Sequence, residues 1–190
     1  MRAFIGLNLP HDILLKLSGL QTLLKETHAD VTWVKQTNLH ITLKFLGEIN
    51  SKQLKKVCLA LKKTAEVNHC FMSNLAELGV FPDARSIRLI WVGLDQKNQK
   101  IKQLAASLED ALEELKLAQE KRGFSAHITI GRVRSGLNLN KLSQEINTMR
   151  LYFADTNTHF KIDKITLFES RITACGLAYE ALEEVNLRIS

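Results

Sequence analysis

Two short segments of the chain carry a histidine two residues before a threonine, interleaved with aliphatic side chains. The first reads His-Ile-Thr-Leu at 40–43, and the second reads His-Ile-Thr-Ile at 127–130. They are 87 residues apart, close to half of the 190-residue chain. Both lie in apolar runs typical of β-strands, in which side chains alternate between the two faces. Each segment therefore presents an imidazole beside a hydroxyl on one face and an aliphatic surface on the other.

The same alternation assigns the residues that follow the first tetrad. It predicts that Lys44 shares the face of His40 and Thr42, and that Phe45 belongs to the inward apolar face. A pseudo-twofold relation between the halves would bring the two histidine–threonine pairs face to face across a groove.

Two facing histidines suit acid–base chemistry at a phosphodiester without a metal. A neutral imidazole removes a proton from the attacking hydroxyl or water, and an imidazolium protonates the leaving oxygen. The unperturbed pKa of about 6.5 allows histidine to take both roles. Thr42 and Thr129 can donate hydrogen bonds to the phosphoryl oxygens. Lys44 or Arg132 can add positive charge there.

Simpler interpretations compete with this one. A single histidine in a strand is usually structural, but two copies at half-chain spacing favour chemistry. Zinc needs more ligands than two histidines, and Glu48 is the only acid close to the first tetrad, so no metal is predicted. The phosphate-binding, dinucleotide-binding, serine-hydrolase and zinc-protease motifs are missing, so no cofactor is predicted.

The elements that must position these residues alternate between helix and strand. Helices are expected from Pro10 to Leu24, from an N-cap at Ser51 to Leu61, and over 101–115 and 139–149. Strands are expected at 2–9, 31–34, 39–46, 70–81, 87–94, 124–133, 151–153, 159–168 and 177–187. The result is an α+β chain in two roughly equivalent halves with largely antiparallel sheets. No Pro/Gly/Ser-rich linker separates them, so a single domain over 1–190 is predicted.

Composition agrees with a globular enzyme. Hydrophobic residues make up 45% of the chain and charged residues 24%, and no apolar run approaches the ~18 residues of a membrane-spanning helix. The net charge of +6 makes a polyanionic partner plausible. Three widely spaced cysteines indicate neither a disulfide framework nor a zinc knuckle. We expect a cytoplasmic protein without membrane association, and a monomer.

The pattern resembles the 2H phosphoesterase superfamily, and within it the bacterial and archaeal RNA 2′,3′-cyclic phosphodiesterases, also called 2′-5′ RNA ligases. The matching residues span nearly the whole chain: 1–10, Trp33, Val34, 38–48, Phe81, Pro82, 88–94, Phe124, 127–129, Arg132, Leu167, Ser170 and Tyr179. One departure is Ala126, where the family usually has proline before the second histidine. Loss of that proline is expected to loosen the approach to His127, without removing a chemical group.

The resemblance implies a bilobal α+β fold with a groove between the lobes. It implies opening of an RNA 2′,3′-cyclic phosphate by water to a 2′-phosphate, and reversible 2′-5′ ligation of tRNA halves without ATP. His40 is taken as the general acid and His127 as the general base. Thr42 and Thr129 would hold the phosphate, with Arg132 in the same role.

Two other functions stay open from the sequence. One is a different activity of the same superfamily, such as cleavage of 2′-5′ oligonucleotides or trimming of RNA 3′ ends. The other is a non-catalytic module that grips an RNA end with the groove and the positive charge. The intact histidine–threonine pairs favour catalysis, because binding alone needs lysine and arginine rather than two titrating imidazoles.

Overall fold

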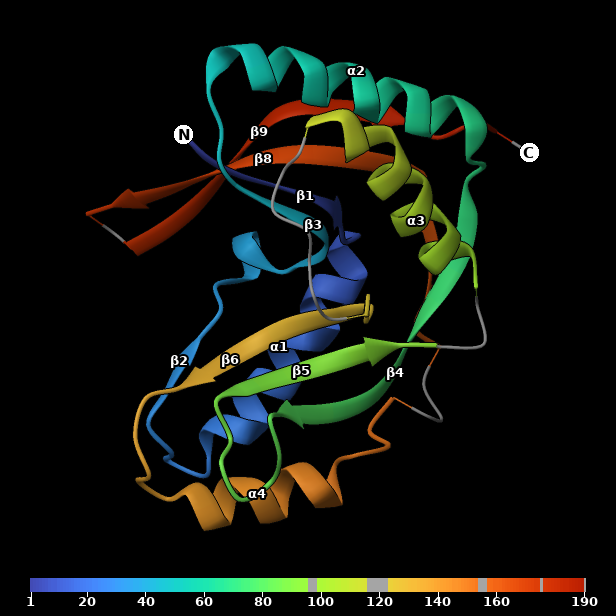
Figure 1. Ribbon diagram of the computed structural model, residues 1–190. Helices are drawn as coiled ribbons and strands as arrows, with labels where there is room; N and C mark the ends of the chain where they lie inside the picture. Colours follow the sequence, from blue (N-terminus) through green and yellow to red (C-terminus); the bar gives the residue numbers. More distant parts are fainter. Residues whose placement is uncertain (96–98, 116–122, 154–156, 175, 190) are drawn as a thin grey trace.

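The computed structural model describes residues 1–95, 99–115, 123–153, 157–174 and 176–189. Two antiparallel sheets organise it (Figure 1). The first sheet has the order β3 (His40–Glu48), β1 (Arg2–Asn8), β8 (Lys164–Thr173), β9 (Gly176–Asn186). The second has the order β2 (Val31–Trp33), β6 (His127–Val133), β5 (Leu89–Leu94), β4 (Phe71–Phe81), β7 (His159–Ile162). The α+β prediction with two antiparallel lobes is confirmed.

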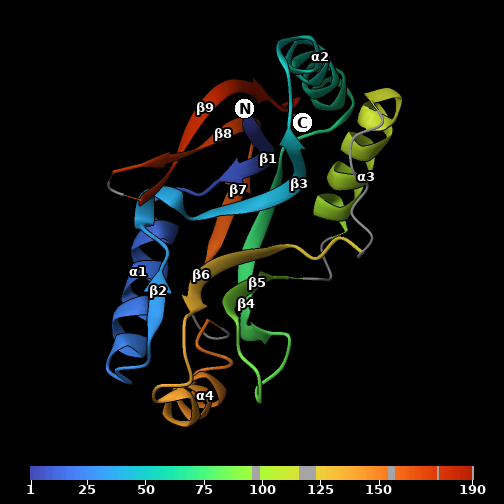
Figure 2. The same ribbon diagram turned by 60° about the vertical axis from the view of Figure 1, so that its left-hand side comes forward.

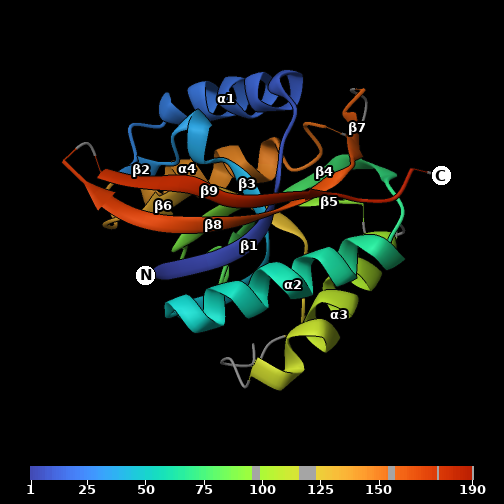
Figure 3. The same cartoon turned by 90° about the horizontal axis from the view of Figure 1, so that it is seen from above.

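In the described part of the chain, four α-helices and two short 3₁₀ helices accompany the sheets: α1 (His11–Lys25), η1 (Gln36–Asn38), α2 (Ser51–Val67), α3 (Lys100–Leu112), η2 (Glu113–Leu115) and α4 (Leu139–Thr148). Helices α2 and α3 pack together, α2 against β8 and β9 and α3 against β3 (Figures 1 and 3). Helix α1 contacts β6 and α4, and so belongs to the lobe built on the second sheet. Among the described residues, no helix is long and apolar enough to cross a membrane.

The lobes are not the two halves of the sequence, which corrects the simple two-half prediction. The first half contributes α1, β2, β4 and β5 to the lobe of β6, and the second half contributes α3, β8 and β9 to the lobe of β3. A helix packs wherever its apolar stripe finds a matching sheet face, and sequence order does not decide which sheet that is. Because each half of the chain supplies elements to both lobes, both halves connect the two lobes.

A repeat with the spacing of the two tetrads nevertheless runs through the fold. Adding 87 to the bounds of β1, α1 and β3 leads to β5, α3 and β6 within two residues, and adding 87 to the start of α2 leads to within one residue of the start of the shorter helix α4. The strand order β3-β1-β8-β9 in one sheet corresponds to β6-β5-β4-β7 in the other. Strands β3 and β6 are therefore equivalent, and they lie next to each other where the lobes meet (Figure 2).

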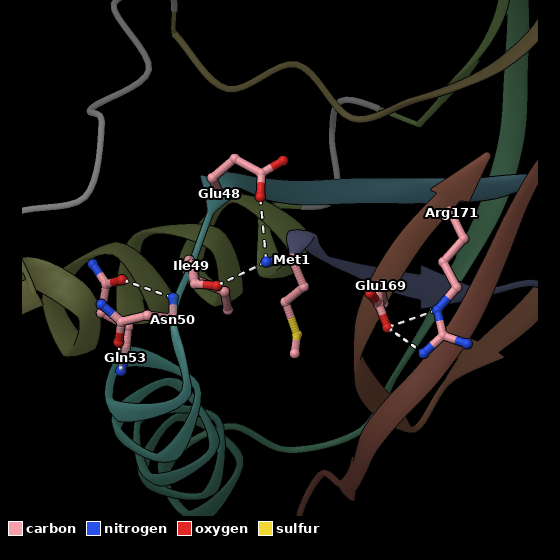
Figure 4. Close-up of polar contacts among 7 residues, drawn as sticks. All are labelled: Met1, Glu48, Ile49, Asn50, Gln53, Glu169 and Arg171. Carbon is pink, nitrogen blue, oxygen red and sulfur yellow. Dashed lines mark hydrogen bonds and ion pairs between the residues drawn. The ribbon is translucent and has the colours of Figure 1, made fainter.

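Local sequence explains most of the boundaries. Helix α2 starts one residue earlier than predicted, because Asn50 and not Ser51 is the N-cap. Asn50 accepts hydrogen bonds from the backbone of Lys52 and Gln53, and the Gln53 side chain accepts from the Asn50 backbone (Figure 4). This reciprocal pair satisfies donors that the first turn leaves open. Residues 151–153, predicted as a strand, form a turn, and the predicted strand at 159–168 is split at Asp163 into β7 and β8.

Candidate active site

A cavity of about 360 Å³ opens between the two sheets. Its wall includes all five residues singled out as catalytic or phosphate-binding: His40 and Thr42 from β3, and His127, Thr129 and Arg132 from β6. Further lining comes from β2 and the segment after it, and from the start of β9. The tertiary structure therefore brings together two strands that are distant in sequence.

The two imidazoles are held in the same way. His40 Nδ1 lies 2.7 Å from the carbonyl oxygen of Asn38, and His127 Nδ1 lies 2.8 Å from that of Ser125. A carbonyl oxygen can only accept, so each Nδ1 carries the hydrogen and donates. Nε2 is then the nitrogen that gains or loses a proton in both rings. His40 Nε2 also lies 3.0 Å from Thr42 Oγ1.

Strands β3 and β6 each contain a β-bulge one residue after the threonine, and the bulge determines which of the following side chains face the groove. The pairing of β1 with β3 passes from Gly6–Thr42 to Ile5–Lys44, which leaves Leu43 as the extra residue. The pairing of β5 with β6 skips Ile130 in the same way. An extra residue reverses the alternation beyond it.

The prediction that Lys44 shares the face of His40 is therefore wrong, and so is the inward position of Phe45. Lys44 is buried and its Nζ lies 2.5 Å from Glu109 Oε1 on α3, away from the groove. Phe45 is 61% exposed and lines the groove. The second bulge places Arg132, the counterpart of Phe45 at +87, in the groove as well.

Each histidine lies beside a stacked aromatic pair. Phe4 and Phe168 stack with ring centroids 5.0 Å apart, and Phe4 lies 4.7 Å from His40. Around the other histidine, Trp91 and Phe81 stack at 5.0 Å, and Phe81 meets the His127 ring edge-on at 5.5 Å. Phe4 and Trp91, and likewise Phe81 and Phe168, are again 87 residues apart. These rings restrict the orientation of the imidazoles.

Two glycines complete the repeated set. Gly6 on β1 and Gly93 on β5 are also separated by 87 residues. A Cβ on Gly6 would come within 2.7 Å of the Ile41 carbonyl oxygen and 3.5 Å of the His40 ring. Gly93 pairs directly with His127. Neither the aromatic pairs nor the glycines were found as site residues, yet extending the spacing of the tetrads along the sequence would have found them.

The two histidines differ in their surroundings. Tyr179 on β9 meets the His40 ring edge-on at 5.0 Å and has no aromatic counterpart 87 residues earlier. Burial, with smaller effects from the positive Arg132 and from His127, holds the pKa of His40 below its usual value. Burial also raises the pKa of Tyr179. The hydrogen bond of His127 to Ser125 is exposed to solvent, whereas those of His40 are partly buried.

Ala126, at the position where the family usually has proline, is hydrogen-bonded to the end of the neighbouring strand β5. Its carbonyl oxygen accepts a hydrogen bond from the backbone of Leu94, at 3.4 Å. Within the described ranges, the groove included, no three side chains of His, Cys, Asp and Glu gather as a metal-ligand set.

The family model described as "LigT like Phosphoesterase" matches this chain twice, at residues 7–91 and 92–175. The chain belongs to this family of phosphoesterases. The two matches divide the chain between the two tetrads, in agreement with the repeat.

Curated relatives cover almost the whole chain. A protein of Methanocaldococcus jannaschii named RNA 2′,3′-cyclic phosphodiesterase is 30% identical over 97% of this chain and 99% of its own length. A protein of the same name from Methanothermobacter thermautotrophicus is 28% identical over 98% of this chain and 99% of its own.

Solved structures share the fold. A crystal structure from Thermus thermophilus superposes with a TM-score of 0.81 at 22% identity, covering 99% of this chain and 98% of that one. Escherichia coli LigT, crystallised with 3′-AMP, gives a TM-score of 0.80 at 24% identity, covering 98% of this chain and 97% of that one.

Proposed function

We propose that this phosphoesterase opens RNA 2′,3′-cyclic phosphate ends to 2′-phosphates with its two histidines, without metal or ATP. The observation that carries the proposal is the shared arrangement of the imidazoles. Both Nδ1 atoms are engaged by backbone carbonyls, so both Nε2 atoms serve for proton transfer from opposite walls of one groove. The names of the nearly full-length relatives support the choice of substrate.

The reaction needs one proton to leave the nucleophile and one to reach the leaving oxygen. Water attacks phosphorus opposite the 3′-oxygen, and His127 Nε2 accepts its proton. The bond between phosphorus and the 3′-oxygen breaks, and His40 Nε2 delivers a proton to that oxygen. The phosphate stays on the 2′-oxygen. The hydroxyls of Thr42 and Thr129 and the charge of Arg132 stabilise the phosphoryl oxygens, where negative charge grows in the transition state.

The surroundings of the histidines support this division of roles. His127 has the solvent-exposed hydrogen bond, and water reaches an exposed imidazole more readily. The lowered pKa of His40 makes its imidazolium a stronger acid, which eases proton delivery to the leaving oxygen. A phosphate anion bound beside His40 favours the charged form and so loads it with a proton.

A chain-end assay tests the reaction. A short RNA with a 2′,3′-cyclic phosphate is incubated with the protein and EDTA in the absence of ATP, and the product is identified by mass and by chromatography against 2′-phosphate and 3′-phosphate standards, which have the same mass. A 2′-phosphate end is expected. An unchanged end with folded protein would refute the proposal, and a 3′-phosphate would refute the regiochemistry. Addition of an RNA with a 5′-hydroxyl tests for 2′-5′ ligation, in which that hydroxyl replaces water.

Variants test the two histidines. His40→Ala and His127→Ala should each abolish turnover and remain folded, while His11→Ala, on the exposed start of α1, serves as the matched control. Retained turnover in either groove variant would rule out the two-histidine mechanism. RNA binding that is salt-sensitive and unchanged in both variants, without turnover in the wild type, would favour the binding module.

To assign the roles, a cyclic substrate with sulfur in place of the 3′-oxygen is used, since a thiolate leaves without a proton. This substrate should restore turnover to His40→Ala and not to His127→Ala. The reverse result would exchange the two roles.

A further inference from the structure

The β8–β9 ribbon extends beyond the body of the protein (Figures 1 and 3). Its strands pair from Lys164–Asn186 out to Thr173–Gly176. Ile172 pairs with Leu177, and Ser170 pairs with Tyr179. Since paired residues and residues two apart share a face, these four side chains lie on one face of the ribbon. We call Ile172, Leu177 and Tyr179 the ribbon face.

The ribbon face continues the wall of the catalytic groove. Tyr179 packs on His40, and both Tyr179 and Leu177 line the cavity. Further out, Leu177 is 43% exposed and Ile172 is 91% exposed. Two residues of an extended strand span roughly 7 Å, which is the length of about two stacked nucleotides. The exposed apolar surface therefore begins at the catalytic histidine and reaches one or two nucleotides beyond it.

The opposite face of the ribbon is polar, and its charged side chains pair with one another. The Arg171 guanidinium donates two hydrogen bonds to Glu169, at 2.6 and 2.9 Å, and forms an ion pair with Glu180 at 2.5 Å (Figure 4 shows the bonds to Glu169). Solvent suits this face. Beyond Tyr179 the ribbon is thus amphipathic: Ile172 and Leu177 are exposed on one face, and the ion-paired residues lie on the other.

One residue ties the ribbon to the catalytic centre. The Asn38 side chain donates a hydrogen bond to the Leu177 carbonyl oxygen at 2.7 Å, and its own carbonyl oxygen accepts from His40 Nδ1. The position of the ribbon face relative to His40 is therefore fixed by two bonds of the same residue.

Charge indicates what covers the ribbon face. Burial raises the pKa of Tyr179, while the nearby guanidinium groups of Arg132 and Arg2 act in the opposite direction. Arg132 lines the same cavity as Tyr179, and Arg2 precedes Ala3, which pairs with Glu169 on β8, so two positive charges lie near the base of the apolar surface. Alternation of negative phosphates with flat apolar bases is the property of single-stranded nucleic acid, and sites that bind it combine such charges with surfaces for base packing.

We propose that the ribbon face binds the nucleoside on the 5′ side of the terminal one in the RNA substrate. The proposal rests on the proposed function, and it adds that the enzyme prefers an oligonucleotide end to a cyclic mononucleotide. The terminal cyclic phosphate lies between the histidines, and the preceding base packs on Leu177 and Ile172.

The test compares kcat/KM for a nucleoside 2′,3′-cyclic phosphate with that for di- and trinucleotides ending in the same group. Wild type should prefer the dinucleotide. Ile172→Ser should reduce this preference on the order of fivefold, as expected when the burial of one aliphatic side chain is lost, and leave mononucleotide turnover unchanged. Ile172→Trp should increase the preference, because a larger flat surface packs better on a base. Leu59→Ser, which alters a leucine on α2 that is 60% exposed, is the matched control.

Several outcomes overturn the proposal. An equal kcat/KM for mono- and dinucleotide, or a preference that Ile172→Ser and Ile172→Trp leave unchanged, would show that the ribbon face does not touch RNA. A dimer in sedimentation that Ile172→Ser dissociates would assign the face to a second copy of the chain. Failure of the proposed function itself looks different, since no cyclic phosphate would then be opened. In that case the affinity of a fluorescent dinucleotide with a 2′-phosphate still decides whether Ile172 binds RNA.

Discussion

Replacing Gly6 by alanine should damage catalysis without touching a catalytic group. Gly6 lies opposite Thr42 in the β1–β3 pairing. The added methyl would lie 2.7 Å from the carbonyl oxygen of Ile41, closer than the 3.0 Å that real Cβ contacts respect. That oxygen is part of the backbone and cannot rotate away, so the strands must separate. Overpacking of this kind costs about 1–3 kcal/mol.

The expected loss can be measured by thermal unfolding. An unfolding entropy of about 2.1 cal/mol/K per residue converts this cost for a chain of this size into a fall in Tm of roughly 2.5–7.5 °C. The displaced β3 carries His40 and Thr42, and a shift of about 1 Å in a catalytic group can lower turnover about 100-fold. We expect Gly6→Ala to reduce kcat by about that factor on a cyclic phosphate substrate.

A substitution at a second glycine, Gly19, tests whether the loss of turnover comes from lower stability or from the displacement of β3. Gly19 lies inside α1, and nothing would lie within 4 Å of an added Cβ. Gly19→Ala should therefore raise stability by about 0.5–1 kcal/mol. The double variant should recover part of the melting temperature and none of the turnover. Wild-type Tm and kcat in Gly6→Ala, or recovery of kcat in the double variant, would refute the reasoning.

Two further predictions concern His40 and Lys44. The His40 ring should titrate below 6.5 by NMR, and Tyr179→Ala should raise the midpoint by admitting water; an unchanged midpoint would contradict burial as the cause. Because the folded pKa lies below the unfolded one, the unfolded state binds more protons between them. The contribution of His40 to the free energy of unfolding is therefore complete above about 6.5 and is lost as pH falls toward the folded pKa, and His40→Gln should remove this dependence in denaturant titrations. Lys44→Met should change the free energy of unfolding by less than about 1.5 kcal/mol, because the aliphatic replacement stays buried and the exposed Glu109 carboxylate loses only a weak ion pair. The value of kcat/KM should stay within about twofold of wild type. A larger fall in kcat/KM would place Lys44 in the groove.

The sequence alone was sufficient for the chemistry-bearing pattern and for most elements. The tetrads at 40–43 and 127–130 repeat within apolar strands, and this periodicity is local. The helical stripe of Ile101, Leu104 and Leu108 likewise predicted α3, because burial of one face follows from spacing within a single element. The family resemblance was confirmed over nearly the whole chain, and the antiparallel two-lobe fold with it.

Tertiary structure decided which residues accompany the tetrads into the groove. Lys44 and Phe45 exchanged faces because Leu43 is bulged against β1, and a bulge is a property of two paired strands rather than of one. The same applies to Arg132, which reaches the groove through the bulge at Ile130. The alternation of side chains in one segment cannot predict a bulge, because the extra residue is defined only by the pairing with the neighbouring strand.

The lobes follow the same rule at a larger scale. The sequence repeats every 87 residues, yet α1 packs with β6 and α3 packs with β3, across the repeat. Periodicity determines that a helix has an apolar stripe, whereas the partner is selected by which sheet face is free and within reach of the connecting chain. The sequence therefore indicated which groups are candidates for the chemistry, and only the packing of the whole chain determined where each of them points.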